Sequence, residues 1–193
     1  MNPKLWINSF TKPKDTFQAE KGNANFKDGA INYAMAGLLV AIIGLIIGLA
    51  TKISSSSSTT AILIGAPIVI IMYIILYPLA AIFGQGILYV IAKYILGGKG
   101  TADQQYYLTS LYAVPVLIIS LIPIINILNI FYALYLETIA IRETHGFGTG
   151  KAVLTWLIPL IVVGILVLLV AAPLLYSSMG SMSATGYSII PFQ

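Results

Sequence analysis

The sequence predicts an all-α, polytopic membrane protein with five transmembrane helices. Hydrophobic residues make up 59% of the 193 residues and charged residues only 8%, whereas soluble domains carry roughly 25% charged residues. The mean hydropathy is +0.95. Long apolar runs alternate with short polar or glycine-rich loops. Because so few charges cannot cover a surface in water, the lipid bilayer must be the solvent for most of the chain.

Missing residue types exclude several kinds of functional site. The chain has no cysteine, which excludes disulfides, thiolate metal sites and cysteine nucleophiles. The single histidine, His145, argues against a zinc site built from the protein alone. The sequence shows no nucleophile–base pair and no cluster of metal ligands. We therefore expect a protein that is not an enzyme and that holds no cofactor or metal ion.

Residues 1–28 form a polar and basic N-terminal arm. Trp6, Phe10 and Phe17 recur at near-helical spacing, and Pro13 can open a second short helix. This pattern predicts two short amphipathic helices that lie in the membrane interface with the aromatic side toward lipid. The alternative is a flexible tail with scattered aromatic residues. The arm would precede a transmembrane domain over residues 29–176 and an extracytoplasmic tail over residues 177–193.

The first predicted span is Ala30–Ala50. Gly37, Ala41, Gly44 and Gly48 follow one another at intervals of three or four residues. They would make one face of small residues, which lets a second helix approach closely.

The second predicted span, Ala61–Leu96, is too long for one straight crossing. About 36 residues at about 1.5 Å per residue exceed a hydrocarbon core of roughly 30 Å. The segment is either one helix bent at Pro67 and Pro78 or two short spans. Neither proline is flanked by a charge or a polar turn, which favours one kinked span. Its first turns, Ala61–Pro67, would then lie shallow at the membrane surface.

The remaining spans follow from the apolar runs. Tyr106–Ile122 is the third, with a bend at Pro115, and Pro123–Asn126 turns the chain. Leu128–Ile141 with its flanks is the fourth, and Ala152–Leu175 is the fifth.

Lysine and arginine positions predict the orientation. With five spans and the N-terminus inside, Lys52 is the one basic residue outside and the other nine lie inside, as the positive-inside rule requires. With six spans, five of the ten basic residues would lie outside and five inside. We therefore expect an N-in, C-out protein of the cell membrane, or of an endomembrane if the source is eukaryotic.

A polar and basic cluster is expected at the inner ends of the spans. Its members are Lys93, Lys99, Asp103, Glu137, Arg142, Glu143, His145 and Lys151. Glu137 lies within a span, which makes it a candidate functional carboxylate. The favoured alternative is that Glu137 caps a loop or pairs with Lys93, Lys99 or Lys151. His145 is expected to be a solvated loop residue.

Two glycine-rich loops, Gly97–Asp103 and Thr144–Lys151, bracket the hairpin formed by the third and fourth spans. The second fails as a nucleotide phosphate loop, because its glycine spacing is one residue short and Ala152 replaces the required serine or threonine. Both loops place backbone N–H groups near lysines, so a lipid phosphate is an alternative ligand.

Several motifs, in order, resemble those of a known family. Pro13–Phe17 precedes the first span, Leu88–Gly98 ends in a double glycine, and Tyr112-Ala-Val-Pro115 lies in the third span. Tyr132-Ala-Leu-Tyr135 and Lys151-Ala152 follow. Over about Thr11–Pro159 the chain resembles the Yip1-domain family of small membrane proteins.

The resemblance implies five transmembrane helices and a cytoplasmic N-terminus. Eukaryotic members are linked to vesicle traffic, Rab-type GTPases and membrane shaping, but their N-terminal arms are longer. We expect a membrane-organising or protein-docking scaffold. Its partners would be membrane lipids, a protein at the cytoplasmic face and a second copy of the chain, with no nucleic acid. The alternative is a small transporter or channel that uses the kinked second helix, Gln85 and Glu137.

Overall fold

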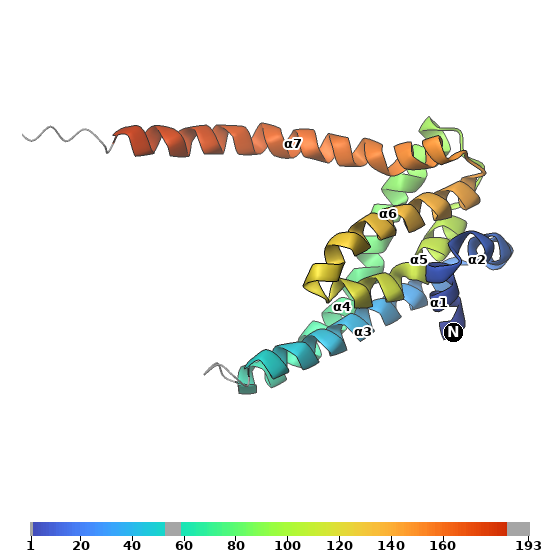
Figure 1. Ribbon diagram of the computed structural model, residues 1–193, viewed down its shortest axis with the longest axis horizontal. Coiled ribbons are helices and arrows are strands. Elements are labelled where there is room, and N and C mark those ends of the chain that lie inside the picture. Colours follow the sequence, from blue (N-terminus) through green and yellow to red (C-terminus); the bar gives the residue numbers. More distant parts are fainter. Residues whose placement is uncertain (1, 53–58, 185–193) are drawn as a thin grey trace, which may run out of the picture. The chain divides into compact units, whose positions relative to one another are not determined.

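The computed structural model describes the backbone of residues 2–52 and 59–184, and the side chains of residues 2–50 and 64–173. Every regular element within these residues is helical (Figure 1). The elements are α1 (Pro3–Thr11), α2 (Pro13–Glu20), the 3₁₀ turn η1 (Lys21–Asn23), α3 (Phe26–Lys52), α4 (Thr59–Val90), the π-helical turn η2 (Ile91–Ile95), α5 (Ala102–Ser120), α6 (Pro123–His145) and α7 (Thr149–Ala184).

Four helices among the described residues are long and apolar enough to cross a membrane. They are Phe26–Ala50, Ile64–Ile95, Pro123–His145 and Thr149–Pro173. The all-α, multi-pass prediction is therefore confirmed. The count of five spans and the N-in, C-out orientation stay predictions.

The predicted third span corresponds to α5, which is not one of these four helices. Its ten residues from Gln105 to Val114 are all buried, and it contacts α1, α3, α4 and α6. Because neighbouring helices surround this part of α5, it can carry polar side chains that lipid would not tolerate. The helix therefore forms the centre of the fold rather than a lipid-facing wall.

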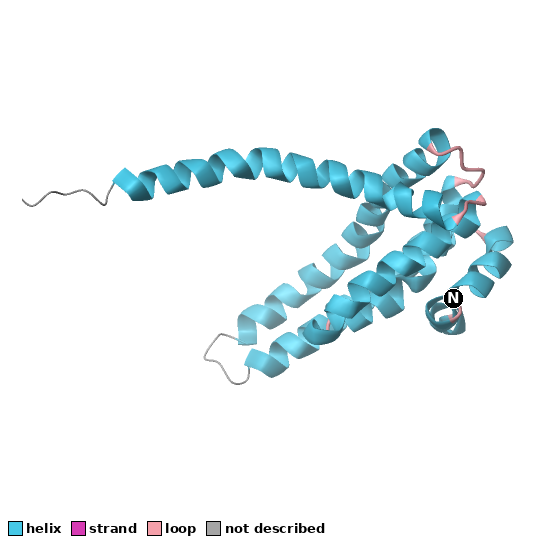
Figure 2. Cartoon of the chain, turned by 45° about the horizontal axis from the view of Figure 1, so that its top comes forward, coloured by secondary structure: helices cyan, strands magenta, loops and turns pink. Residues whose placement is uncertain are grey.

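The second span is a single long helix. α4 runs from Thr59 to Val90 with Pro67 and Pro78 in its interior, and the alternative of two short spans is wrong. α3 and α4 lie side by side (Figure 2). The turn between α5 and α6 lies at Leu121–Ile122, before the predicted Pro123–Asn126, because a proline fits the first position of a helix.

Residues 1–155 form one compact unit and residues 156–193 a second. The described part of the second unit is the remainder of α7, where Leu, Ile and Val side chains are exposed at consecutive positions from Ile165 to Val170. Of the predicted tail 177–193, residues 177–184 continue this helix, and residues 185–193 lie outside the described part.

The N-terminal arm forms the two predicted short helices, but its aromatic side does not face lipid. Trp6 and Phe17 are buried in apolar clusters with residues of α3, α5 and α6. The ring of Phe10 packs edge-on against Tyr132 with 4.7 Å between centroids. The interface prediction for this side is therefore wrong. α3, α5 and α6 offer an apolar surface that takes these rings in place of lipid.

Candidate functional site

Glu137 lies on α6 and bonds to two uncharged side chains. Tyr112 on α5 donates its hydroxyl to Oε2 of Glu137. Gln85 on α4 places Nε2 3.2 Å from both carboxylate oxygens. The expected pairing with a lysine is wrong, because the described part of the chain shows an ion pair only between Arg142 and Glu143. Glu137 instead joins three helices.

The polar contacts continue from Gln85 toward the C-terminal end of α6. Gln105 donates Nε2 to the backbone oxygen of Gln85 at 3.1 Å and to its Oε1 at 3.0 Å. Oε1 of Gln105 lies 2.8 Å from Nε2 of His145. Tyr112, Glu137, Gln85, Gln105 and His145 thus form one hydrogen-bonded chain, which we call the polar core.

His145 is buried, with 1% of its surface exposed, so the prediction of a solvated loop residue is wrong. Nε2 of His145 faces the amide oxygen of Gln105, an acceptor, so the neutral form of the ring that fits this contact carries its proton on Nε2. Nδ1 and the buried hydroxyl of Thr144 have no hydrogen-bond partner among the described residues.

The loop that covers His145 depends on glycine. Gly97 has a φ of +75°, a left-handed conformation in which other residues are strained. A Cβ on Gly98 would strike the imidazole of His145 and would lie 2.9 Å from the carbonyl oxygen of Ala92. A Cβ on Gly100 would lie 2.5 Å from the carbonyl oxygen of Thr144. The double glycine therefore packs the loop directly on the end of α6.

Three lysines bond to backbone oxygens near the ends of helices. Lys93 donates to Gly100 at 3.3 Å, Lys151 to Leu96 at 3.0 Å and Lys21 to Glu143 at 2.7 Å. Leu96 and Glu143 lie at the C-terminal ends of η2 and α6, where carbonyl groups lack helical partners and cations are favoured, whereas Gly100 lies in the loop before α5. The lysines thus tie the arm and both glycine-rich loops to one another and to the C-terminal end of α6.

The other predicted members of the cluster lie apart from the polar core. Arg142 pairs with Glu143 at 2.8 Å. Gln18 of α2 donates to the same carboxylate at 3.0 Å. Lys99 and Asp103 are exposed. The structure therefore separates the predicted cluster into a buried chain, a set of backbone ties and an exposed surface.

Sequence reasoning missed Gln105 and Tyr112 as members of the polar core. The predicted third span begins at Tyr106 and leaves Gln105 outside it, and Tyr112 was considered as part of the Tyr112-Ala-Val-Pro115 motif. A signal was present, because Gln105, Thr109 and Tyr112 lie at helical spacing. All three are buried.

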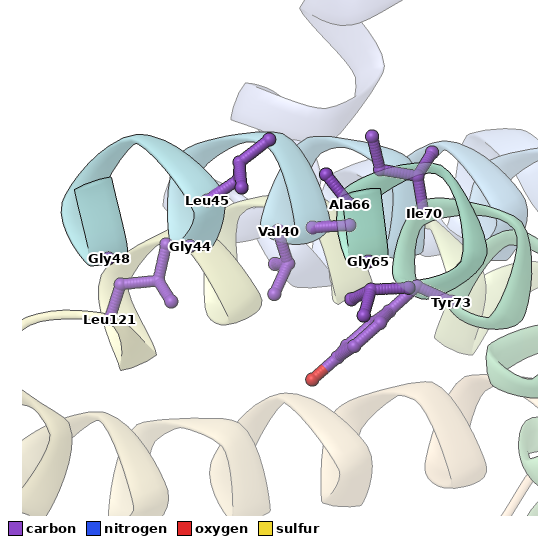
Figure 3. Close-up of a pocket in the computed structure, with 11 residues that line it drawn as sticks. Val40, Gly44, Leu45, Gly48, Gly65, Ala66, Ile70, Tyr73 and Leu121 are labelled. Carbon is purple, nitrogen blue, oxygen red and sulfur yellow. The ribbon is translucent and has the colours of Figure 1, made fainter. Parts of the chain in front are cut away.

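The predicted small-residue face of α3 divides in two. A Cβ on Gly37 would lie 2.5 Å from the carbonyl oxygen of Tyr73, and Ala41 is buried. Ala41, Gly44 and Gly48 line an apolar groove of about 460 Å³ between α3, α4 and Leu121 (Figure 3). Close helix contact thus occurs at Gly37, while farther along α3 the missing side chains leave space.

Within the described residues, no group of three or more His, Asp or Glu side chains could hold a metal ion. The model of the Yip1 domain family matches residues 7–172. No curated protein and no solved structure matches the chain.

Proposed function

The chain belongs to the Yip1 domain family, and from that premise we propose that it is a non-enzymatic scaffold that organises the membrane or docks a protein. The family and the four apolar helices make it a multi-pass membrane protein of the Yip1 class. We propose the cell membrane as its location, or an endomembrane in a eukaryote. Its proposed partners are membrane lipids, a protein at the inner face and a second copy of the chain.

The observation that carries this proposal is the fixed position of the arm. Phe17 is fully buried against α5 and α6. Lys21 and Gln18 bond to Glu143 at 2.7 and 3.0 Å. A surface that is held in place before binding loses less conformational entropy when a partner docks. The arm and the inner loops together supply such a surface.

The exposed part of this surface is basic. Its exposed lysines are Lys4, Lys12, Lys14, Lys27, Lys99 and Lys151. Each lysine near an anionic membrane contributes roughly 1 kcal/mol. The same charges would attract an acidic segment of a partner protein.

The experiment is quantitative co-purification in mild detergent from the protein's own membranes. A variant with Lys12→Gln, Lys14→Gln and Lys99→Gln removes three exposed charges and no buried contact. We expect it to lose a protein that copurifies with the native chain, with no change in melting temperature. Lys52→Gln, at the opposite end of α3 from the arm, is the control for position; it removes one positive charge, whereas the triple variant removes three. Equal recovery of partners by both variants contradicts the proposal.

A small transporter or channel is the second candidate, and the contact between Gln85 and Glu137 is the observation in its favour. It ranks second because the same bonds satisfy both side chains with partners inside the protein, as in a purely structural network. Solute flux in proteoliposomes that stops in Glu137→Gln, while the fold is retained, would move it to first place.

A further inference from the structure

A cavity of about 240 Å³ lies between α1, α3 and α5, apart from the polar core. The residues that matter for its chemistry are Leu5, Trp6, Asp28, Ile31, Asn32 and Tyr107. Drug-sized pockets measure roughly 300–1,000 Å³. The cavity therefore suits a small polar group rather than a peptide or a whole acyl chain.

The cavity lies at the height of lipid headgroups. Asp28 is in the first turn of α3, and α3 supplies the first membrane-length segment, Phe26–Ala50. A residue in the first turn of a spanning helix lies near the membrane–water boundary.

The chemistry of the cavity favours a cation. Asn25 donates Nδ2 to the Asp28 carboxylate at 2.6 Å, and Asp28 makes no ion pair with any other described residue. A second carboxylate, Glu20, accepts the hydroxyl of Tyr107 at 2.9 Å. A carboxylate beside the indole of Trp6 and the phenol ring of Tyr107 is an arrangement that binds ammonium groups through charge and cation–π attraction.

The surroundings favour a ligand that carries both signs of charge. The chain has a formal net charge of +4, which disfavours a free cation. Lys4 and Lys27 are exposed and adjoin the lining residues Leu5 and Asp28 in sequence. They supply positive charge for a phosphate linked to the ammonium group.

We propose that this cavity binds the ammonium group of a zwitterionic phospholipid headgroup. Asp28 holds the charge, Trp6 and Tyr107 form the walls, and Leu5 and Ile31 contact the start of the lipid tails. The site is independent of the proposed scaffold role and gives the arm a lipid preference that lysines alone would not.

The test uses the full chain in detergent with Trp156→Phe. The chain has two tryptophans, so Trp6 becomes the single fluorescent reporter. We titrate short-chain phosphatidylethanolamine and compare phosphatidylglycerol with the same tails. We expect a saturable change in Trp6 emission with phosphatidylethanolamine and no saturable change with phosphatidylglycerol.

Two variants test the assignment of the cavity. Asp28→Asn should weaken phosphatidylethanolamine binding by about tenfold or more, the loss expected for one charge-assisted contact. Asp103→Asn removes another exposed carboxylate and should bind as the parent does. Ile31→Phe fills the cavity without a change of charge and should also weaken binding. Thermal unfolding verifies that each variant is folded.

Three results would overturn the proposal. The first is an equal response to phosphatidylglycerol, and the second is unchanged affinity in a folded Asp28→Asn or Ile31→Phe protein. The third is a saturable response to a lysine-containing peptide but none to phosphatidylethanolamine, which would assign the cavity to a protein partner.

Discussion

Ser9 of α1 places its hydroxyl 2.9 Å from the carbonyl oxygen of Leu111 in α5. This oxygen lacks its usual helical partner, because residue 115 is a proline and has no N–H to donate. Ser9 is fully buried, so water does not serve the carbonyl from that side. The arm therefore completes the hydrogen bonding of the central helix at its proline.

Ser9→Ala should destabilise the protein, because it removes the hydroxyl that serves the Leu111 oxygen. A buried group left without its partner costs about 1–3 kcal/mol. For a chain of this size, each kcal/mol lowers the melting temperature by roughly 2–4 °C. Thermal unfolding of the full chain in detergent measures the effect.

The control for this prediction is Pro115→Ala, which restores an N–H to position 115. In that background the Leu111 oxygen has a helical donor again, so Ser9→Ala should lower the melting temperature clearly less. An equal decrease in melting temperature in the two backgrounds would show that Ser9 does not act through the Leu111 carbonyl that Pro115 leaves without a donor.

Gly98→Ala should destabilise the packing of the Gly97–Asp103 loop on the C-terminal end of α6. The added methyl group would strike His145 and would lie 2.9 Å from the oxygen of Ala92, and such overpacking typically costs about 1–3 kcal/mol. Gly148→Ala is the matched control, because a Cβ there meets no atom within 4 Å. Melting temperatures that fall equally in both variants would argue against a tight contact at Gly98.

The sequence predicts where helices begin and end much better than it predicts what each helix packs against. Pro13 predicted where the second arm helix begins, and α2 does begin there. The spacing of Trp6, Phe10 and Phe17 could not distinguish a lipid-facing side from a protein-facing side. Both environments reward the same apolar stripe.

The polar core shows the same limit. Glu137 was identified as a candidate, yet its partners Gln85 and Tyr112 lie 52 and 25 residues away in sequence. Such contacts depend on how three helices are rotated about their axes. Small differences in apolar packing set these rotations, and a single sequence does not specify them. A lysine was therefore the favoured partner only because of its charge.

Glu137→Ala should be more destabilising than Glu137→Gln. Alanine leaves the Tyr112 hydroxyl and the Gln85 amide without their acceptor, at about 1–3 kcal/mol for each buried group. Glutamine keeps one oxygen as an acceptor, although its NH2 group replaces the other oxygen beside the Gln85 amide nitrogen, so its loss of stability should be smaller than that of alanine. Melting temperatures in detergent test the order, and a Glu137→Ala protein as stable as the native chain would show that Glu137 is not part of a satisfied network.

Phe17→Ala should release the arm from the membrane domain. Phe17 is fully buried, and its ring centroid lies 6.1 Å from that of Tyr112. Loss of a buried phenylalanine typically costs about 3–5 kcal/mol. Trp6, the other large buried side chain of the arm, holds α1 against α3 and α5, so the loss of Phe17 should loosen α2 first. Limited proteolysis should therefore cut residues 1–25 faster than in the native chain.

The control is Ile7→Ala, at a residue 62% exposed on the same arm, which should leave the rate of proteolysis unchanged. Equal cleavage of the native and Phe17→Ala proteins would mean that the polar ties at Glu143 and Leu111 hold the arm without this side chain.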